Sequence, residues 1–257
     1  MGDIAPLIKY WAFGLLLLLI LQFIVFLYAY NKKRIDLVDV FWGISFIVIS
    51  CFYTILNIND INVTTLVVLI CVIVWGSRLS IHIFNRYKSR QNQDERYSAI
   101  TQSFIAMPAL VYVRVFAIQA VLASLVMIVF LAALLSTRHD MNLLIVGFVV
   151  WLFGLFFEST ADRQLKRHVA EDSGSLMKTG LWKYSRHPNY FGELVQWWAI
   201  WLMVAGGTYA LVGLIGPFSI SILILFVSGI PPLEKHMASK KGWKDYKNST
   251  SVLIPWL

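Results

Sequence analysis

The residues best suited to chemistry lie in the segment 180–193, where basic side chains run directly into the start of an apolar helix. Arg186 and His187 precede Pro188, a residue that suits the first turn of a helix, and Lys178 lies shortly before them. A helix N-terminus presents free N–H groups and the positive end of a dipole, so it favours anions. We therefore expect an anion-binding site here. The alternative is a basic loop that binds lipid headgroups.

Three polar side chains continue below these charges along one face of the expected helix. Asn189, Glu193 and Gln196 recur at the spacing that puts residues on the same side of an α-helix. Polar groups inside an apolar helix are costly in a membrane, so each is a candidate functional residue. Headgroup binding explains the basic residues but not these three, and a binding site is favoured.

Two further candidates interrupt apolar runs nearer the N-terminus. Asp39, near the start of the run 37–57, could cap that helix or act as a buried acid, and both interpretations remain open. Arg78 shares a helical face with Trp75 and His82. It lies too deep to reach the interface as easily as a terminal arginine would.

The middle of the chain adds an arginine and two acids. Arg114 lies about two turns inside the expected helix 108–136, where it could pair with a structural partner or with an anion. Asp162 and Lys166 have the i,i+4 spacing of a solvated helix end, but Glu158 follows an apolar stretch and fits that explanation less well.

The residues after the last apolar run are less specific. Glu234 and Tyr246 stand in a basic stretch that could lie on a membrane surface. No spacing of Cys and His residues predicts a zinc site, so we expect no metal. The chain also lacks the glycine-rich fingerprints of soluble nucleotide-binding folds.

These side chains must be positioned by membrane helices, because the composition excludes a soluble enzyme. Hydrophobic residues make up 58% of the 257 positions and charged residues 14%, and the mean hydropathy is +0.69. A globular domain carries about 25% charged residues. A membrane helix needs about 20 mostly apolar residues, and we count seven candidates: roughly 8–30, 37–57, 63–84, 108–136, 142–162, 190–206 and 209–230.

The charge pattern orients this bundle. Most of the 22 Lys and Arg residues fall in loops that seven helices would place on one side. Cytoplasmic loops carry the excess of Lys and Arg, so we expect the N-terminus outside and the C-terminus in the cytoplasm. The net charge of +8 therefore need not indicate a nucleic-acid partner. The apolar runs predict an all-α fold. No linker divides the chain, so we predict a single membrane domain over 1–257. A bacterial inner membrane and an endoplasmic reticulum both fit, and the oligomeric state is open.

In these motifs the sequence resembles the steroid 5-alpha-reductase superfamily, and most closely its bacterial-type branch of unknown function (DUF1295-like). The long segment Gly-Leu-Trp-Lys-Tyr-Ser-Arg-His-Pro-Asn-Tyr-Phe-Gly-Glu, residues 180–193, is similar to the superfamily's C-terminal signature. Four further motifs are similar to that branch: Val38-Asp-Val-Phe-Trp-Gly43, Trp75-Gly-Ser-Arg78-Leu79, Asp94-Glu-Arg-Tyr97, and Tyr246 followed by Ile254-Pro-Trp256. The resemblance covers nearly the whole chain.

What the resemblance implies is a seven-helix membrane enzyme that binds NADPH in its cytoplasmic half, about residues 142–257. Lys178, Arg186 and the start of the sixth helix would hold the phosphates. Asn189 and Glu193 would bind the nicotinamide amide or ribose hydroxyls. The full set of implied cofactor residues is Asp162, Lys178, Tyr184, Arg186, His187, Asn189, Tyr190, Glu193, Glu234 and Tyr246.

The implied reaction is hydride transfer from NADPH to a C=C bond conjugated to a carbonyl in a lipophilic substrate. Steroid reductases polarise that carbonyl with an acid on the second helix and a tyrosine on the third. Here the third helix has no tyrosine, so the resemblance assigns the catalytic roles to Asp39, as a protonated donor, and Arg78. Substrate contacts fall to Trp42, Trp75 and Arg114.

Two other functions remain open. Isoprenylcysteine carboxyl methyltransferases carry a similar Arg-His-Pro-x-Tyr-x-Gly segment and bind S-adenosylmethionine there, so a membrane methyltransferase is the first alternative. The second is a non-catalytic protein that binds a lipid or a sterol. The partners expected in every case are the bilayer and a lipophilic small molecule.

Overall fold

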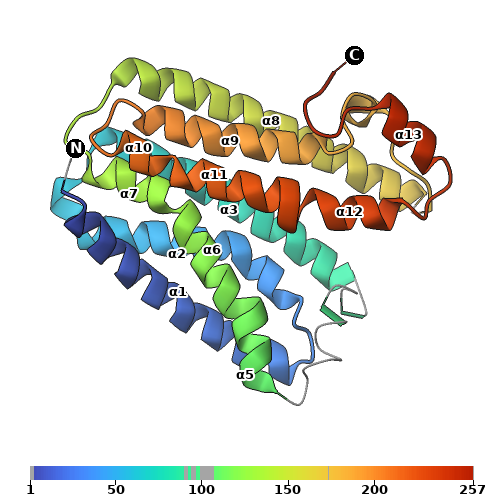
Figure 1. Ribbon diagram of the computed structural model, residues 1–257, viewed down its shortest axis with the longest axis horizontal. Helices are drawn as coiled ribbons and strands as arrows, with labels where there is room; N and C mark the ends of the chain where they lie inside the picture. Colours follow the sequence, from blue (N-terminus) through green and yellow to red (C-terminus); the bar gives the residue numbers. More distant parts are fainter. Residues whose placement is uncertain (1–2, 90–91, 94–96, 99–106, 173, 257) are drawn as a thin grey trace. The chain divides into compact units, whose positions relative to one another are not determined.

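The computed structural model describes residues 3–89, 92–93, 97–98, 107–172 and 174–256 (Figure 1). Within these ranges the chain forms helices and turns, with one isolated bridge, between Ser185 and Ser251, and no β-sheet. The expected all-α class is therefore confirmed for the described part of the chain.

Among the described residues, six stretches are long and apolar enough to cross a membrane, so the chain is an integral multi-pass membrane protein. Three are continuous helices near the N-terminus, α1 (Ala5–Asn31), α2 (Leu37–Leu56) and α3 (Val63–Ser89). The fourth, Pro108–Leu135, consists of α5 (Pro108–Val111), a π-helical stretch (Tyr112–Ala117), α6 (Ile118–Val126) and α7 (Ile128–Leu135). The fifth is α8 (Met141–Glu171). The sixth, Ala210–Met237, contains α10 (Ala210–Gly213), α11 (Ile215–Ile222), a π-helical stretch (Leu223–Val227) and α12 (Ile230–Met237).

Two differences from the expected spans matter for the site. The segment expected at 190–206 is α9 (Pro188–Val204), which has 17 residues and is shorter than the six spans above. The segment expected at 142–162 continues as α8 to Glu171. Its polar last turns therefore belong to the helix and not to a loop, because Asp162 and Lys166 have helical spacing and need no apolar surface to remain helical. The short helix α13 (Trp243–Ser249) follows α12.

The chain folds into two compact units, each described here by itself. One contains Met1–His139 and Val204–Ile215, and the other contains Asp140–Met203 and Gly216–Leu257. A single membrane domain can contain two such units, so the expected single domain stays a prediction.

In the first unit, α2 and α3 cross closely enough that their backbones meet. A Cβ added to Gly76 would lie 2.8 Å from the carbonyl oxygen of Gly43. Small residues allow membrane helices this close approach. Around the crossing, the ring of Phe46 packs edge-on against both Trp42 (5.1 Å between centroids) and Trp75 (5.2 Å).

In the second unit, α8 and α9 run antiparallel and equally close (Figure 1). A Cβ on Gly154 would lie 2.8 Å from the carbonyl oxygen of Gly192, and one on Gly192 would lie 2.6 Å from the backbone nitrogen of Glu158. The start of α8 is fixed by Asp140, whose carboxylate accepts hydrogen bonds from the backbone of Asn142 (2.9 Å), as an N-cap does. This helix pair carries the buried carboxyl groups of Glu158, Asp162 and Glu193.

Candidate functional site

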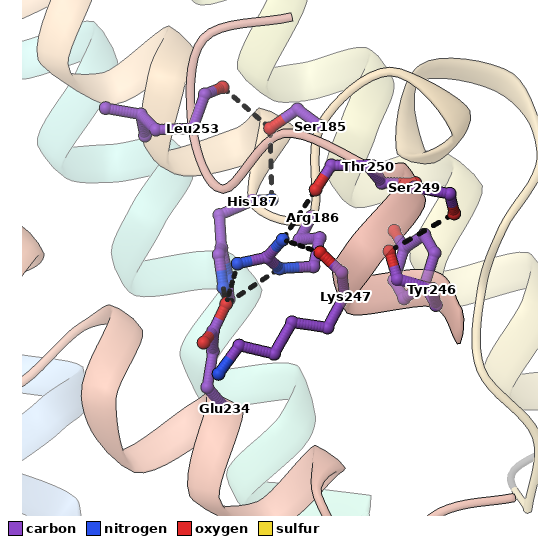
Figure 2. A network of polar contacts seen from close by, with 9 residues as sticks. All are labelled: Ser185, Arg186, His187, Glu234, Tyr246, Lys247, Ser249, Thr250 and Leu253. Atoms are coloured by element: carbon purple, nitrogen blue, oxygen red, sulfur yellow. Dashed lines mark hydrogen bonds and ion pairs between the residues drawn. The ribbon is translucent and has the colours of Figure 1, made fainter. Parts of the chain in front are cut away.

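Arg186 forms the centre of a polar network in the second unit (Figure 2). Its Nε donates to Oε1 of Glu234 on α12 at 2.8 Å, and its Nη2 lies 2.8 Å from the same oxygen. Its Nη1 donates to the backbone carbonyls of Lys247 (2.9 Å) and Thr250 (2.5 Å). The side chain is only 8% exposed. The guanidinium therefore ties α12 and the end of α13 to the loop that precedes α9.

The same loop binds the extended residues after α13 through its backbone. Ser185 pairs with Ser251 in a parallel bridge, and the backbone N–H of Arg186 donates to the carbonyl of Ser251 at 2.8 Å. The hydroxyl of Ser185 donates to the carbonyl of Leu253 at 2.7 Å (Figure 2). The backbone N–H of Trp256 donates to the carbonyl of Tyr184 at 3.2 Å. We call residues 251–256 the strap.

Aromatic side chains connect α13 to α8 beneath the strap. The buried hydroxyl of Tyr246 donates to the carbonyl of Trp182 at 2.6 Å. The indole N–H of Trp182 donates in turn to the carbonyl of Ala161 on α8 at 3.1 Å. Burial raises the pKa of Tyr246 to about 12, so its hydroxyl stays protonated as a donor. Lys178, exposed, donates to the carbonyl of Gly242 at 3.3 Å.

His187 is almost fully buried within the network. It is 1% exposed, its ring stacks on Tyr190, and its Nε2 lies 3.5 Å from Oε1 of Glu234. Among the described residues, Nε2 makes no hydrogen bond of normal geometry, and the carboxylate of Glu234 is its nearest charged neighbour. Burial is the main cause that lowers the pKa of His187 to about 4; Glu234 opposes the shift, and Arg186 adds a smaller lowering effect. The imidazole is therefore neutral near pH 7, with one buried nitrogen available to a ligand.

Buried polar side chains continue from this network along α8 and α9. Glu158 (2% exposed) accepts a hydrogen bond from the amide of Gln196 (1% exposed) at 2.6 Å. Asp162 on α8 and Glu193 on α9 are also buried. A buried carboxylate needs hydrogen bonds or charge partners to be stable, so this helix pair offers a strongly polar interior to a ligand.

The second unit thus brings together most of the cofactor residues expected from the sequence. Direct contacts join Arg186, His187 and Glu234, and the ring of His187 contacts Tyr190. Tyr184 and Tyr246 belong to the same network through backbone carbonyls, and Lys178 lies with its Nζ 5.6 Å from the ring centre of Tyr246. Asn189 is half-buried in the first turn of α9.

In the first unit, Asp39 has a partner that sequence reasoning did not assign. The hydroxyl of Tyr97 donates to Oδ1 of Asp39 at 2.5 Å. Tyr97 is 8% exposed and packs in an apolar cluster with Val38, Val111 and Phe116. The motif 94–97 contains this tyrosine, but nothing in the sequence places it beside a residue 58 positions away. Residues 94–96 lie outside the described part of the chain.

The other expected residues of the first unit are more dispersed. Trp42 and Trp75 both contact Phe46, and Trp75 is 1% exposed. Arg78 is half-buried on α3, whereas Arg114 is exposed on the π-helical stretch. No group of His, Cys, Asp and Glu residues in the described part of the chain could hold a metal ion.

Comparison with known proteins connects both units to one family. The family model "Protein of unknown function (DUF1295)" matches residues 25–250. Two curated proteins named 3-oxo-5-alpha-steroid 4-dehydrogenase 1 are 29% identical over 114 residues, which is 43% of this chain. The match covers 40% of the Rattus norvegicus protein and 41% of the Mus musculus protein. A steroid 5-alpha-reductase of Arabidopsis thaliana is 35% identical over 60 residues, 22% of this chain and 23% of its own. The chain thus spans about two fifths of the length of the first two relatives. No solved structure matches significantly.

Proposed function

Because this chain belongs to the DUF1295 family and is similar to named steroid 5-alpha-reductases, we propose that it is a membrane-embedded reductase. Its substrate is a lipophilic molecule with a C=C bond conjugated to a carbonyl. NADPH, when bound, supplies the hydride, which adds to the β-carbon of that bond, and a proton adds to the α-carbon.

The observation that carries this proposal is the hydrogen-bonded pair of the buried Tyr97 and the half-buried Asp39. Hydride addition puts negative charge on the carbonyl oxygen, and a hydrogen-bond donor held there lowers the barrier. The resemblance calls for a tyrosine beside the acid, which α3 does not supply. Tyr97 supplies a phenol 2.5 Å from Asp39 inside an apolar cluster.

This pair can donate a hydrogen bond to a substrate carbonyl only when Asp39 is protonated. Tyr97 donates to Asp39 in the structure. When Asp39 is protonated, the bond reverses: Asp39 donates to the phenol oxygen, and the hydroxyl hydrogen of Tyr97 can point to a substrate carbonyl. A carboxylic acid kept neutral by apolar surroundings can act in this way.

The second unit offers residues that fit a dinucleotide. The buried Nε2 of His187 has no hydrogen-bond partner among the described residues and can bind an amide or a hydroxyl. The buried carboxyl groups of Asp162 and Glu193 can accept hydrogen bonds from ribose hydroxyls. The exposed Lys178 and the N-terminus of α9 can bind phosphates.

Arg186 has a different part in this proposal. Four of its N–H groups serve Glu234, Lys247 and Thr250. We assign it the role of holding the site's elements together, so that Glu234 and Tyr246 stand where the ligand needs them.

The test is to identify what co-purifies with the protein. Protein extracted gently and examined by native mass spectrometry should release NADP(H), and it should oxidise NADPH when given a 4-ene-3-oxo steroid as probe. Bound S-adenosylmethionine would overturn the proposal in favour of a methyltransferase. A lipid without either nucleotide would indicate a binding protein.

We extend the proposal to topology. Seven helices would cross the membrane if α9, with 17 apolar-rich residues, spans together with the six longer stretches. The Lys and Arg residues would then place the N-terminus outside and the C-terminus in the cytoplasm. Labelling of cysteines introduced at exposed Lys9 and exposed Lys241 by a membrane-impermeant reagent should distinguish the two ends.

A further inference from the structure

The strap has two different edges. Its backbone faces the loop before α9, where Ser251, Leu253 and Trp256 make the hydrogen bonds described above. The exposure of its side chains alternates along the segment. Ser251, Leu253 and Pro255 are half-buried, whereas three apolar side chains are exposed: Val252 by 41%, Ile254 by 62% and Trp256 by 77%.

Lysines accompany this exposed apolar edge. Lys244 and Lys247 are exposed on α13, which leads directly into the strap. Lys183 is exposed in the loop that holds the strap, where its carbonyl accepts a hydrogen bond from the hydroxyl of Thr250 at 3.5 Å. Asp245 is also exposed on α13, so lysines outnumber acids beside this edge, and an apolar edge next to a basic surface is typical of segments that lie in a membrane interface.

The place where the strap is attached, just before α9, also indicates a membrane interface. It is fastened to residues 184–186, immediately before Pro188 begins the apolar helix α9. The ends of membrane helices lie at the interface, where tryptophan and lysine side chains are enriched. The exposed Trp256 and the neighbouring lysines are therefore residue types that are common at the membrane interface.

We propose that the outer edge of the strap lies in the bilayer interface. Val252, Ile254 and Trp256 would insert at the boundary between headgroups and acyl chains, and Lys244 and Lys247 would contact anionic headgroups. A second copy of this chain is a poorer occupant, because two such edges facing each other would oppose lysine to lysine. This inference does not depend on the proposed reductase activity. It also links the bilayer to Arg186, whose guanidinium and backbone hold the other edge.

The test places a fluorescent probe on the strap of the full-length protein. Cys51 and Cys71 are first replaced by alanine, and Ile254→Cys is labelled with an environment-sensitive nitrobenzoxadiazole dye. Asp245→Cys, at an exposed position of α13, is the matched control. Each protein is reconstituted in phosphatidylcholine vesicles with and without phosphatidylglycerol.

We expect the probe at Ile254 to emit at shorter wavelength than the probe at Asp245. Nitroxide on the upper acyl chain should quench it, and aqueous iodide should not. Lys244→Glu combined with Lys247→Glu should remove any added quenching seen with phosphatidylglycerol. Val252→Cys gives a second probe position if the first variant does not fold.

Two results would overturn the proposal. Equal quenching of both probes by iodide would show that the strap lies in water. Protection of the Ile254 probe from both quenchers would show that protein covers it, as in a dimer. None of these measurements involves a dinucleotide, so failure here is distinct from failure of the proposed function.

Discussion

Replacing Arg186 by methionine tests whether this residue holds the fold of the site or binds a ligand. The change keeps most of the side chain's length but removes the bonds to Glu234, Lys247 and Thr250. Breaking a buried ion pair by removing one partner costs about 3–5 kcal/mol. The side chain of Glu234 is 18% exposed, so water relieves part of that cost. We therefore expect a loss near the lower end, about 3 kcal/mol.

That loss has a measurable size. For chains of 150–250 residues, 1 kcal/mol shifts Tm by about 2–4 °C, so Arg186→Met should lower Tm by about 6–12 °C. Thermal unfolding in detergent can be followed with a thiol-reactive dye, because Cys71 is buried until the protein unfolds. Arg186→Lys keeps the charge but not the planar guanidinium, so its Tm should lie between those of the unsubstituted protein and Arg186→Met.

A double variant checks the cause. Glu234→Leu combined with Arg186→Met removes both charges, and should cost less than the sum of the single changes if the two residues are coupled. The reasoning is refuted if Arg186→Met lowers Tm by less than about 2 °C while dinucleotide binding is lost. Arg186 would then be a ligand to the cofactor's phosphates and not a structural clamp.

Three further predictions concern other residues. Tyr97→Phe should lower kcat for an enone about 10²–10³-fold with little change in Tm, because it removes one carbonyl donor; an unchanged kcat excludes the pair with Asp39 from the reaction. The pKa of His187 is about 4 in the folded protein and 6.5 for an exposed imidazole. The unfolded chain therefore takes up the proton first, and stability present above pH 6.5 should fall by up to about 3 kcal/mol as the pH drops to 4. His187→Gln should flatten that profile in pH-dependent melts. Gly192→Ala should cost about 1–3 kcal/mol because its Cβ would meet α8, whereas Gly174→Ala, with its nearest atom at 3.5 Å, should leave Tm unchanged.

The membrane helices were predictable because a bilayer demands long apolar runs, and these stand out in a single sequence. The end of α8 was not, since its last turns are polar and only helical spacing distinguishes them from a loop. The shortest segment, α9, was uncertain for a related reason. Glu193 and Gln196 interrupt its apolar run; Gln196 bonds Glu158 on α8, and Glu193 is buried inside the protein, so neither side chain faces lipid.

The sequence predicts where the site lies along the chain, but not which side chains contact each other in it. The basic residues before α9 indicate an anion, but they cannot say which one. The structure places the carboxylate of Glu234, 48 positions along the chain, against Arg186. Tyr97 shows the same limit, since its partner Asp39 is 58 positions away. Spacing along a helix reveals residues on one face, whereas contacts between distant segments depend on packing that one sequence does not display.

The attachment of the strap has an evolutionary consequence. The strap and the preceding Thr250 bond to the loop through main-chain atoms: the carbonyls of Thr250, Ser251 and Leu253 and the N–H of Trp256. Nearly every amino acid has these main-chain atoms, so point substitutions in the strap can accumulate without detaching it. In the loop, two of the bonding groups are side chains, the hydroxyl of Ser185 and the guanidinium of Arg186, and these two positions cannot drift in the same way. In a library of variants, we therefore expect tolerance along one partner of this contact and strong selection on the other.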